Sequence, residues 1–198
     1  KNTLHLAAQY AGDNSRVIQT LIDAGFHVGE VTRDECKSTS LHLAAKFSIT
    51  ATVECLLKAG ADLHCLNAYG RTALMYAATS KADNSRTVQM LIDAGCSVNA
   101  VSQDDERTTA LHLASRWSET PTVQTILKAG ANIGHIDGHG HTVLMSAAEH
   151  TGDNSSTIQI LVDAGCSVYD VSQDEWKATP LHLACRSSTT PTVQALLK

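Results

Sequence analysis

A six-letter pattern recurs along the chain, and its regular spacing constrains the fold more than any other feature. It begins at residues 3, 40, 73, 110, 143 and 180 and reads TLHLAA, SLHLAA, ALMYAA, ALHLAS, VLMSAA and PLHLAC. The steps between successive starts are therefore 37, 33, 37, 33 and 37 residues. A fixed period of roughly 20 to 50 residues is typical of solenoids and other repeat architectures. The sequence predicts one array of stacked units.

Each copy of the pattern is followed by the signals of a second helix. A hydroxyl residue stands where it can cap the first turn, apolar residues such as Ile18, Leu21 and Ile22 follow at helical spacing, and a glycine ends the segment. The predicted caps are Ser15, Thr50, Ser85, Thr120, Ser155 and Thr190. The terminating glycines are Gly25, Gly60, Gly95, Gly130 and Gly165. We expect the first helix of each unit to span about eight to ten residues, too short to be stable without stacking.

The segments TPLHLA (179–184) and LLKAGAD (56–62), together with the 33-residue step, resemble ankyrin repeats. The resemblance covers essentially residues 2–198. It implies an all-α, ankyrin-type solenoid of six stacked helix–turn–helix units with projecting β-hairpin-like loops, whose concave side carries loop tips and first helices. We expect a single array over residues 1–198, and its approximate units are 2–38, 39–71, 72–108, 109–141, 142–178 and 179–198.

The odd units depart from the family pattern because they are four residues longer than the even ones. Alignment places two extra residues before the second helix and two in the following loop. Long and short loops should therefore alternate, and only the short ones keep a tip glycine, at Gly70 and Gly140. The last helix is as apolar as an internal one, so we expect either a fragment of a longer array or an array whose uncapped ends pack on something, for example by end-to-end self-association.

Composition and charge exclude several classes of function. A formal charge of −5 and a pI near 6.0 disfavour a surface that coats nucleic acid. No apolar run approaches the roughly 18 residues of a membrane helix, so we expect no membrane insertion. The six cysteines form no CxxC pair, which is typical of free thiols in a cytoplasmic protein. GxSxG, P-loop and HExxH motifs are absent from the sequence, so we expect neither catalysis nor a cofactor.

Residues that follow the six-letter pattern vary strongly between units, and the family resemblance places them on the concave surface. Tyrosine, tryptophan and arginine are enriched at interface hot spots, so Tyr10, Phe47 and Trp117 are the predicted anchors. The full set of candidates here is Tyr10, Lys46, Phe47, Arg116, Trp117, Glu149, His150 and Arg186. The alternative is that Phe47 and Trp117 pack against a neighbouring long loop.

The tips of the long loops read DECK (34–37), DDER (104–107) and DEWK (174–177), and they hold seven of the chain's 20 acidic residues. No packing reason for their recurrence is evident in the sequence. One interpretation is a comb that binds a basic partner; the other is a solvated loop whose own Lys or Arg offsets part of the charge. The candidate residues are Asp34, Glu35, Asp104, Asp105, Glu106, Asp174, Glu175 and Trp176.

Histidines cluster in HIDGHGH (135–141). No cysteine or helical histidine spacing completes a closed ligand set, and the matching unit carries Cys65, Tyr69 and Arg71 instead. We therefore predict no metal site. A metal-dependent enzyme on this cluster is the weakest of the functional hypotheses. Contact residues of the short loops are instead expected at Tyr69, Arg71, His139 and His141.

The histidines inside the six-letter pattern call for a structural interpretation. The resemblance implies that His5, His42, His112 and His182 each bond to the backbone of a neighbouring loop. Met75 and Met145 take this place in the third and fifth units, so those loops should be held less firmly.

These observations favour a protein–protein interaction module. It would bind a protein or peptide partner, with a basic face, on the concave surface and the loop tips. The alternative is a structural spacer, or an elastic or regulatory arm, within a larger channel, toxin or signalling protein.

Overall fold

The computed structural model describes residues 2–47, 50–187 and 189–198. These residues form successive pairs of short helices. The first helices of the pairs are α1 (Thr3–Ala8), α3 (Ser40–Phe47), α5 (Ala73–Ala77), α7 (Ala110–Trp117), α9 (Val143–Ala148) and α11 (Pro180–Ser187). The second helices are α2 (Ser15–Asp23), α4 (Thr50–Lys58), α6 (Ser85–Asp93), α8 (Thr120–Lys128), α10 (Ser155–Asp163) and α12 (Thr190–Leu196).

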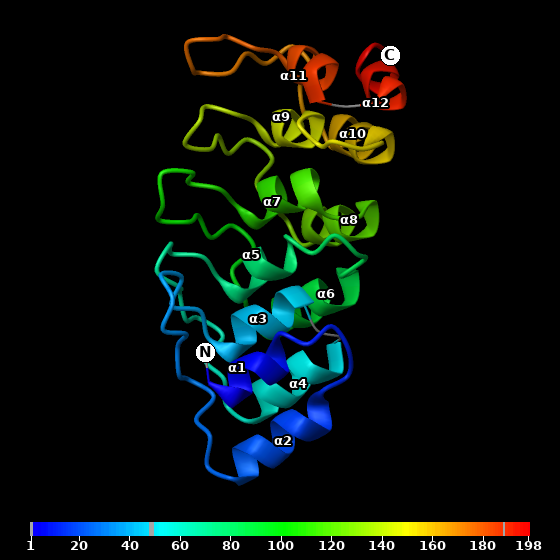
Figure 1. Ribbon diagram of the computed structural model, residues 1–198. Helices are drawn as coiled ribbons and strands as arrows, with labels where there is room; N and C mark the ends of the chain where they lie inside the picture. Colours follow the sequence, from blue (N-terminus) through cyan, green and yellow to red (C-terminus); the bar gives the residue numbers. More distant parts are fainter. Residues whose placement is uncertain (1, 48–49, 188) are drawn as a thin grey trace.

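The helices form two parallel stacks, as predicted. Each first helix packs on the next first helix, and each second helix on the next second helix (Figure 1). The core lies between the stacks and is built from the same position of every six-letter pattern, because identical units bury identical faces. The leucines at this position are at most 1% exposed in the first five pairs: Leu4, Leu41, Leu74, Leu111 and Leu144. Within the described residues, β-structure is limited to isolated bridges.

The predicted ends of the helices need two corrections. The first helices α3, α7 and α11 are eight residues long, within the predicted eight to ten, whereas α1, α5 and α9 have only six, five and six residues. The predicted hydroxyl caps are wrong by one position, since each is the first residue inside its helix: Ser15, Thr50, Ser85, Thr120, Ser155 and Thr190. In α2, α6 and α10 an asparagine is the N-cap, and the Asp before it accepts the N–H of the serine.

Glycines end the second helices as predicted. Each takes the left-handed conformation that only glycine adopts without strain, and the φ values lie between 82° and 105° for Gly25, Gly60, Gly95, Gly130 and Gly165. The short loops use Gly70 and Gly140 in the same way, at 66° and 79°. In the long loops a basic residue takes the left-handed conformation, with φ of 48°, 44° and 47° at Lys37, Arg107 and Lys177.

The loops between pairs project to one side of the helical stacks (Figure 1). We call them fingers 1 to 5, and they comprise residues 26–39, 61–72, 96–109, 131–142 and 166–179. One backbone hydrogen bond joins each finger to the next, and together these bonds form the finger ladder. Its four bonds are Ala68 N–H to Cys36 O, Gln103 N–H to Tyr69 O, Gly138 N–H to Glu106 O, and Gln173 N–H to Gly140 O.

The prediction for the pattern histidines is confirmed at two positions. His5 Nε2 lies 2.9 Å from Glu30 O, and His42 Nε2 lies 3.0 Å from Arg71 O. It is wrong for His112, whose Nε2 has no hydrogen-bond partner in the described part of the chain. The described residues include no finger next to His182 that could supply the carbonyl, so for His182 it stays a prediction. His112 is nevertheless buried, and its ring makes an edge contact with His135 at 5.6 Å between ring centroids.

Candidate functional site

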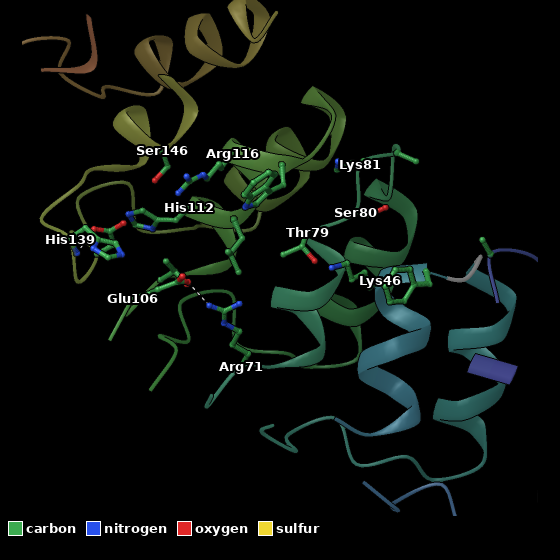
Figure 2. A pocket seen from close by; sticks show the side chains of 17 residues that line it. Lys46, Arg71, Thr79, Ser80, Lys81, Glu106, His112, Arg116, His139 and Ser146 are labelled. Atoms are coloured by element: carbon green, nitrogen blue, oxygen red, sulfur yellow. Dashed lines mark hydrogen bonds and ion pairs between the residues drawn. The ribbon is translucent and has the colours of Figure 1, made fainter. Parts of the chain in front are cut away.

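A hollow of about 880 Å³ opens on the side of the first helices that faces the fingers. We call it the first groove. It forms because α5 ends at Ala77, three residues before the position that matches the ends of α3 and α7. The polar lining residues come from four successive helix pairs and their fingers (Figure 2). They are Lys46, Arg71, Thr79, Ser80, Lys81, Glu106, Thr108, His112, Arg116, Asp137, His139 and Ser146.

Two aromatic side chains occupy matching positions at the ends of α3 and α7. Phe47 is 37% exposed and Trp117 is 41% exposed, so the structure leaves much of each ring uncovered. A cation from the preceding residue lies over each ring: Lys46 Nζ is 5.2 Å from the Phe47 centroid, and Arg116 Cζ is 5.2 Å from the Trp117 centroid. Each pair therefore offers a partner both an apolar face and a positive charge.

Positive charge is concentrated in the first groove. Arg71 pairs with Asp104 at 2.8 Å and also with Glu106, but no carboxylate of the described residues forms an ion pair with Lys46 or Lys81. Burial lowers the pKa of Lys46, and repulsion by Arg71 and Lys81 lowers it further. The groove therefore destabilises the charged form of its own lysine when it is empty.

A second groove of about 580 Å³ lies over α7, α9 and α11. Glu149, whose side chain is only 9% exposed, is its central charge. Arg116 Nη1 lies 3.0 Å from the Glu149 carboxylate, Arg186 Nη2 lies 3.6 Å from it, and His141 Nδ1 lies 3.9 Å from it. His141 Nε2 also lies 3.6 Å from Asp174. The chain thus supplies this groove with a carboxylate of its own.

The first acidic residue of each long fingertip has a structural task that the sequence did not reveal. Asp104 accepts a hydrogen bond of 2.6 Å from the Ser102 hydroxyl, which in turn accepts the Thr108 N–H at 2.9 Å. Fingers 1 and 5 repeat the arrangement with Asp34 and Asp174. The recurrence of these aspartates therefore has a packing reason. The next acidic residue of each tip is exposed: Glu35, Asp105 and Glu175.

The remaining predicted residues lie outside the first groove. Tyr10 is well exposed near the start of the array, and His150 Nδ1 lies 2.8 Å from Arg116 O. Trp176 lines the second groove although it is 86% exposed. Tyr69 and Asp105, together with Glu106 of the first groove, line a small depression beside Arg71.

The histidine cluster and the cysteines show no arrangement for metal binding. The rings of His139 and His141 are 6.3 Å apart between centroids. Among residues 2–47, 50–187 and 189–198, no group of three or more His, Cys, Asp or Glu side chains is placed to hold a metal ion. All six cysteines are free thiols, and burial raises the pKa of Cys96 and of Cys166 to about 11.

Sequence reasoning missed Lys81 and the central role of Glu149. Lys81 lies in the extra residues between α5 and α6, where the sequence analysis placed only a length difference. The extra residues themselves were the available signal, because they shorten the first helix and bring a loop to the groove. The importance of Thr79 also emerges only when the grooves are compared.

Comparison with known families agrees with this architecture. A family model described as ankyrin repeats (3 copies) matches residues 4–102 and 83–172. A search of curated proteins found no match. Within the described residues, no helix has both the length and the apolar character needed to cross a membrane. The helix pairs, the projecting fingers and the matched family model together show that the chain belongs to the ankyrin repeat family, whose members are generally protein–protein interaction modules.

Proposed function

We propose that this chain recognises a segment of a partner protein in the first groove. The observation that carries the proposal is that two half-exposed aromatic side chains, Phe47 at the end of α3 and Trp117 at the end of α7, line one hollow. Exposed aromatic anchors next to arginine are the usual centre of interface energetics. Helices stack about 10 Å apart, so the two anchors, two helices apart, suit an extended segment of about six residues.

The proposal places recognition in the groove rather than at the fingertips. Asp34, Asp104 and Asp174 are engaged by their own loops, and Arg71 neutralises part of the charge on finger 3. Besides these residues, each tip carries one further exposed acid, Glu35, Asp105 or Glu175, beside one exposed base. Such a surface attracts a basic partner less strongly than the sequence indicates.

The proposal is tested with random twelve-residue peptides displayed on phage and selected on the immobilised chain. Trp117→Ala is expected to weaken binding of the selected peptides at least tenfold, in the usual range for a hot-spot aromatic, and to leave the melting temperature nearly unchanged. Trp176→Ala is the matched control, because Trp176 is also exposed but lies outside the first groove. Selected peptides whose affinity is unchanged by Trp117→Ala, or a selection that yields no peptides, would instead support the spacer alternative, which needs no ligand.

A further inference from the structure

The two grooves occupy equivalent places in the array, and a shift of 70 residues superimposes their linings in sequence. The shift relates Lys46 to Arg116, Arg71 to His141, Thr79 to Glu149, and Arg116 to Arg186. Each groove is thus bounded by three basic or ionisable nitrogenous side chains, one from the preceding first helix, one from a finger and one from the following first helix. The two grooves differ most at their centre, where one holds a carboxylate and the other a threonine.

The second groove shows what its geometry accepts. Glu149 lies within 4 Å of Arg116, Arg186 and His141, and its side chain is nearly enclosed. A carboxylate buried to this degree is stable only when cations and donors surround it. The surrounding side chains therefore form a carboxylate-binding site, and Glu149 of the same chain occupies it.

The first groove has a related set of side chains with Thr79 in the place of Glu149, although Arg71 is already paired with Asp104 and Glu106, and Arg116 with Glu149. The hydroxyl of Thr79 donates to Tyr76 O in α5 at 2.8 Å. Lys46 forms no ion pair with a carboxylate of the described residues and is repelled by Arg71 and Lys81. Lys81 adds a further positive charge, since the matching residue near the second groove is Thr151.

We infer that the first groove binds an acidic segment of a partner protein and that a partner Asp or Glu takes the place held by Glu149 in the second groove. This inference deepens the proposed function and rests on it. A basic segment would set its cations against Lys46 and Lys81. An acidic segment removes their repulsion, and its apolar side chains contact Phe47 and Trp117.

The carboxylate site can be tested without a ligand. Thr79→Glu supplies the missing group in the same chain, and Thr79→Gln is the uncharged control of equal length. At pH 7 the Glu variant is expected to show a folding equilibrium constant about 1.5- to fivefold larger than the Gln variant, the range of a partly exposed ion pair. The advantage should shrink in a Lys46→Met background and vanish at pH 3, where the new carboxyl is protonated. A Glu variant no more stable than the Gln variant overturns the inference.

Binding is tested with the phage-selected peptides described above. They are expected to contain more Asp and Glu than the unselected library. Their affinity should fall at least tenfold on Thr79→Glu, which plugs the site, and less than about twofold on Thr79→Gln.

The outcomes separate the two proposals. Peptides that need Trp117 but are neutral or basic, or that tolerate Thr79→Glu, overturn the acidic partner and leave groove recognition standing. Peptides that do not need Trp117, or a selection that yields none, overturn groove recognition itself. A twelve-nucleotide oligo-dT is the competitor that checks the class of partner. If it displaces the peptides as well as an acidic peptide does, the groove is a general polyanion site and the commitment to a protein segment fails.

Discussion

At the scale of single residues, one buried hydroxyl decides the shape of each long finger. Ser102 is 3% exposed, accepts the Thr108 N–H and donates to Asp104. Thr108 is buried, so its backbone N–H needs a hydrogen-bond partner inside the protein, and the Ser102 hydroxyl takes the place of a backbone carbonyl. The acid that sequence analysis assigned to partner binding is thus a part of the loop's internal hydrogen bonding.

Removing this hydroxyl should destabilise the array. Ser102→Ala leaves the Thr108 N–H and one Asp104 oxygen without their partner, so we expect a loss of about 1–3 kcal/mol in the free energy of unfolding. Urea unfolding at pH 7 measures it. Asp105→Ala on the exposed tip is the control and should change stability by less than about 0.5 kcal/mol. Equal effects of the two changes would show that the hydroxyl has no special role.

His112 gives the array a pH dependence whose direction follows from burial. Burial lowers its pKa from the ordinary value of 6.5 to about 4. The unfolded chain therefore takes up a proton below about pH 6.5 while the folded chain does not, so the stability present above that pH is lost as the pH falls towards 4. Between pH 6.5 and 5 the loss from this residue is about 2 kcal/mol.

The chain itself suggests the variant that tests this pH dependence. Methionine occupies the matching position at Met75 and Met145, where it is fully buried. His112→Met therefore introduces an apolar side chain that the fold already accepts at this position. We expect a shallower fall in the free energy of unfolding between pH 6.5 and 5, measured by urea unfolding at both values. His5 and His42 also have pKa values lowered by burial and account for a remaining slope. An unchanged slope would assign the whole pH dependence to them.

At the scale of the helices, the sequence located every second helix but misplaced its first residue. The serine and threonine hydroxyls satisfied the local rule for a cap. The structure prefers Asn84 because its side chain reaches Ala77 O in its own pair at 3.1 Å and Ala45 O in the preceding pair at 2.8 Å. The second partner is 39 residues away in sequence, so local signals could not identify it.

Asn154 makes the same connection at the other end of the array. Its Nδ2 donates to Ser115 O at 2.9 Å and to Ala147 O at 2.8 Å, and the side chain is buried. Asn154→Asp keeps the shape but replaces the donor with an acceptor that faces two carbonyls. We expect a loss of about 2–3 kcal/mol at pH 7 by urea unfolding. Asp153→Asn, which keeps an exposed acceptor for the helix amide, should cost less than 1 kcal/mol; similar losses would contradict the connecting role of Asn154.

At the scale of the whole molecule, the sequence predicted what every unit repeats and missed what only one pair of neighbours does. The stacked helices, the terminal glycines and the alternating fingers follow from letters that recur with the period. The pairing of Arg71 with Asp104 and the enclosure of Glu149 depend on how one finger or helix lies against the next. The sequence therefore pointed to candidates on one face, while their grouping into two grooves, one of them holding Glu149, required the structure.

The finger ladder offers a way to test whether contacts between successive fingers shape the first groove. Gly138 donates its N–H to Glu106 O, and a Cβ added at Gly138 would lie 1.7 Å from Asp105 O. Gly138→Ala must therefore separate fingers 3 and 4. Because Glu106 and Asp137 from these fingers both line the first groove, the change should weaken binding of the selected peptides although it removes no side chain.

The matched control comes from the equivalent step of the ladder. Ala68 donates to Cys36 O at 2.8 Å with its Cβ in place, so Ala68→Gly should cost only the backbone entropy of glycine, about 0.5–1 kcal/mol. For Gly138→Ala we expect faster amide hydrogen exchange at residue 138 and a loss of about 0.5–1.5 kcal/mol, the net contribution of one backbone hydrogen bond. If exchange accelerates while peptide affinity stays unchanged, the fingers move independently of the groove. If both change together, the groove is a property of the stacked array, since no single unit holds the contacts that define it.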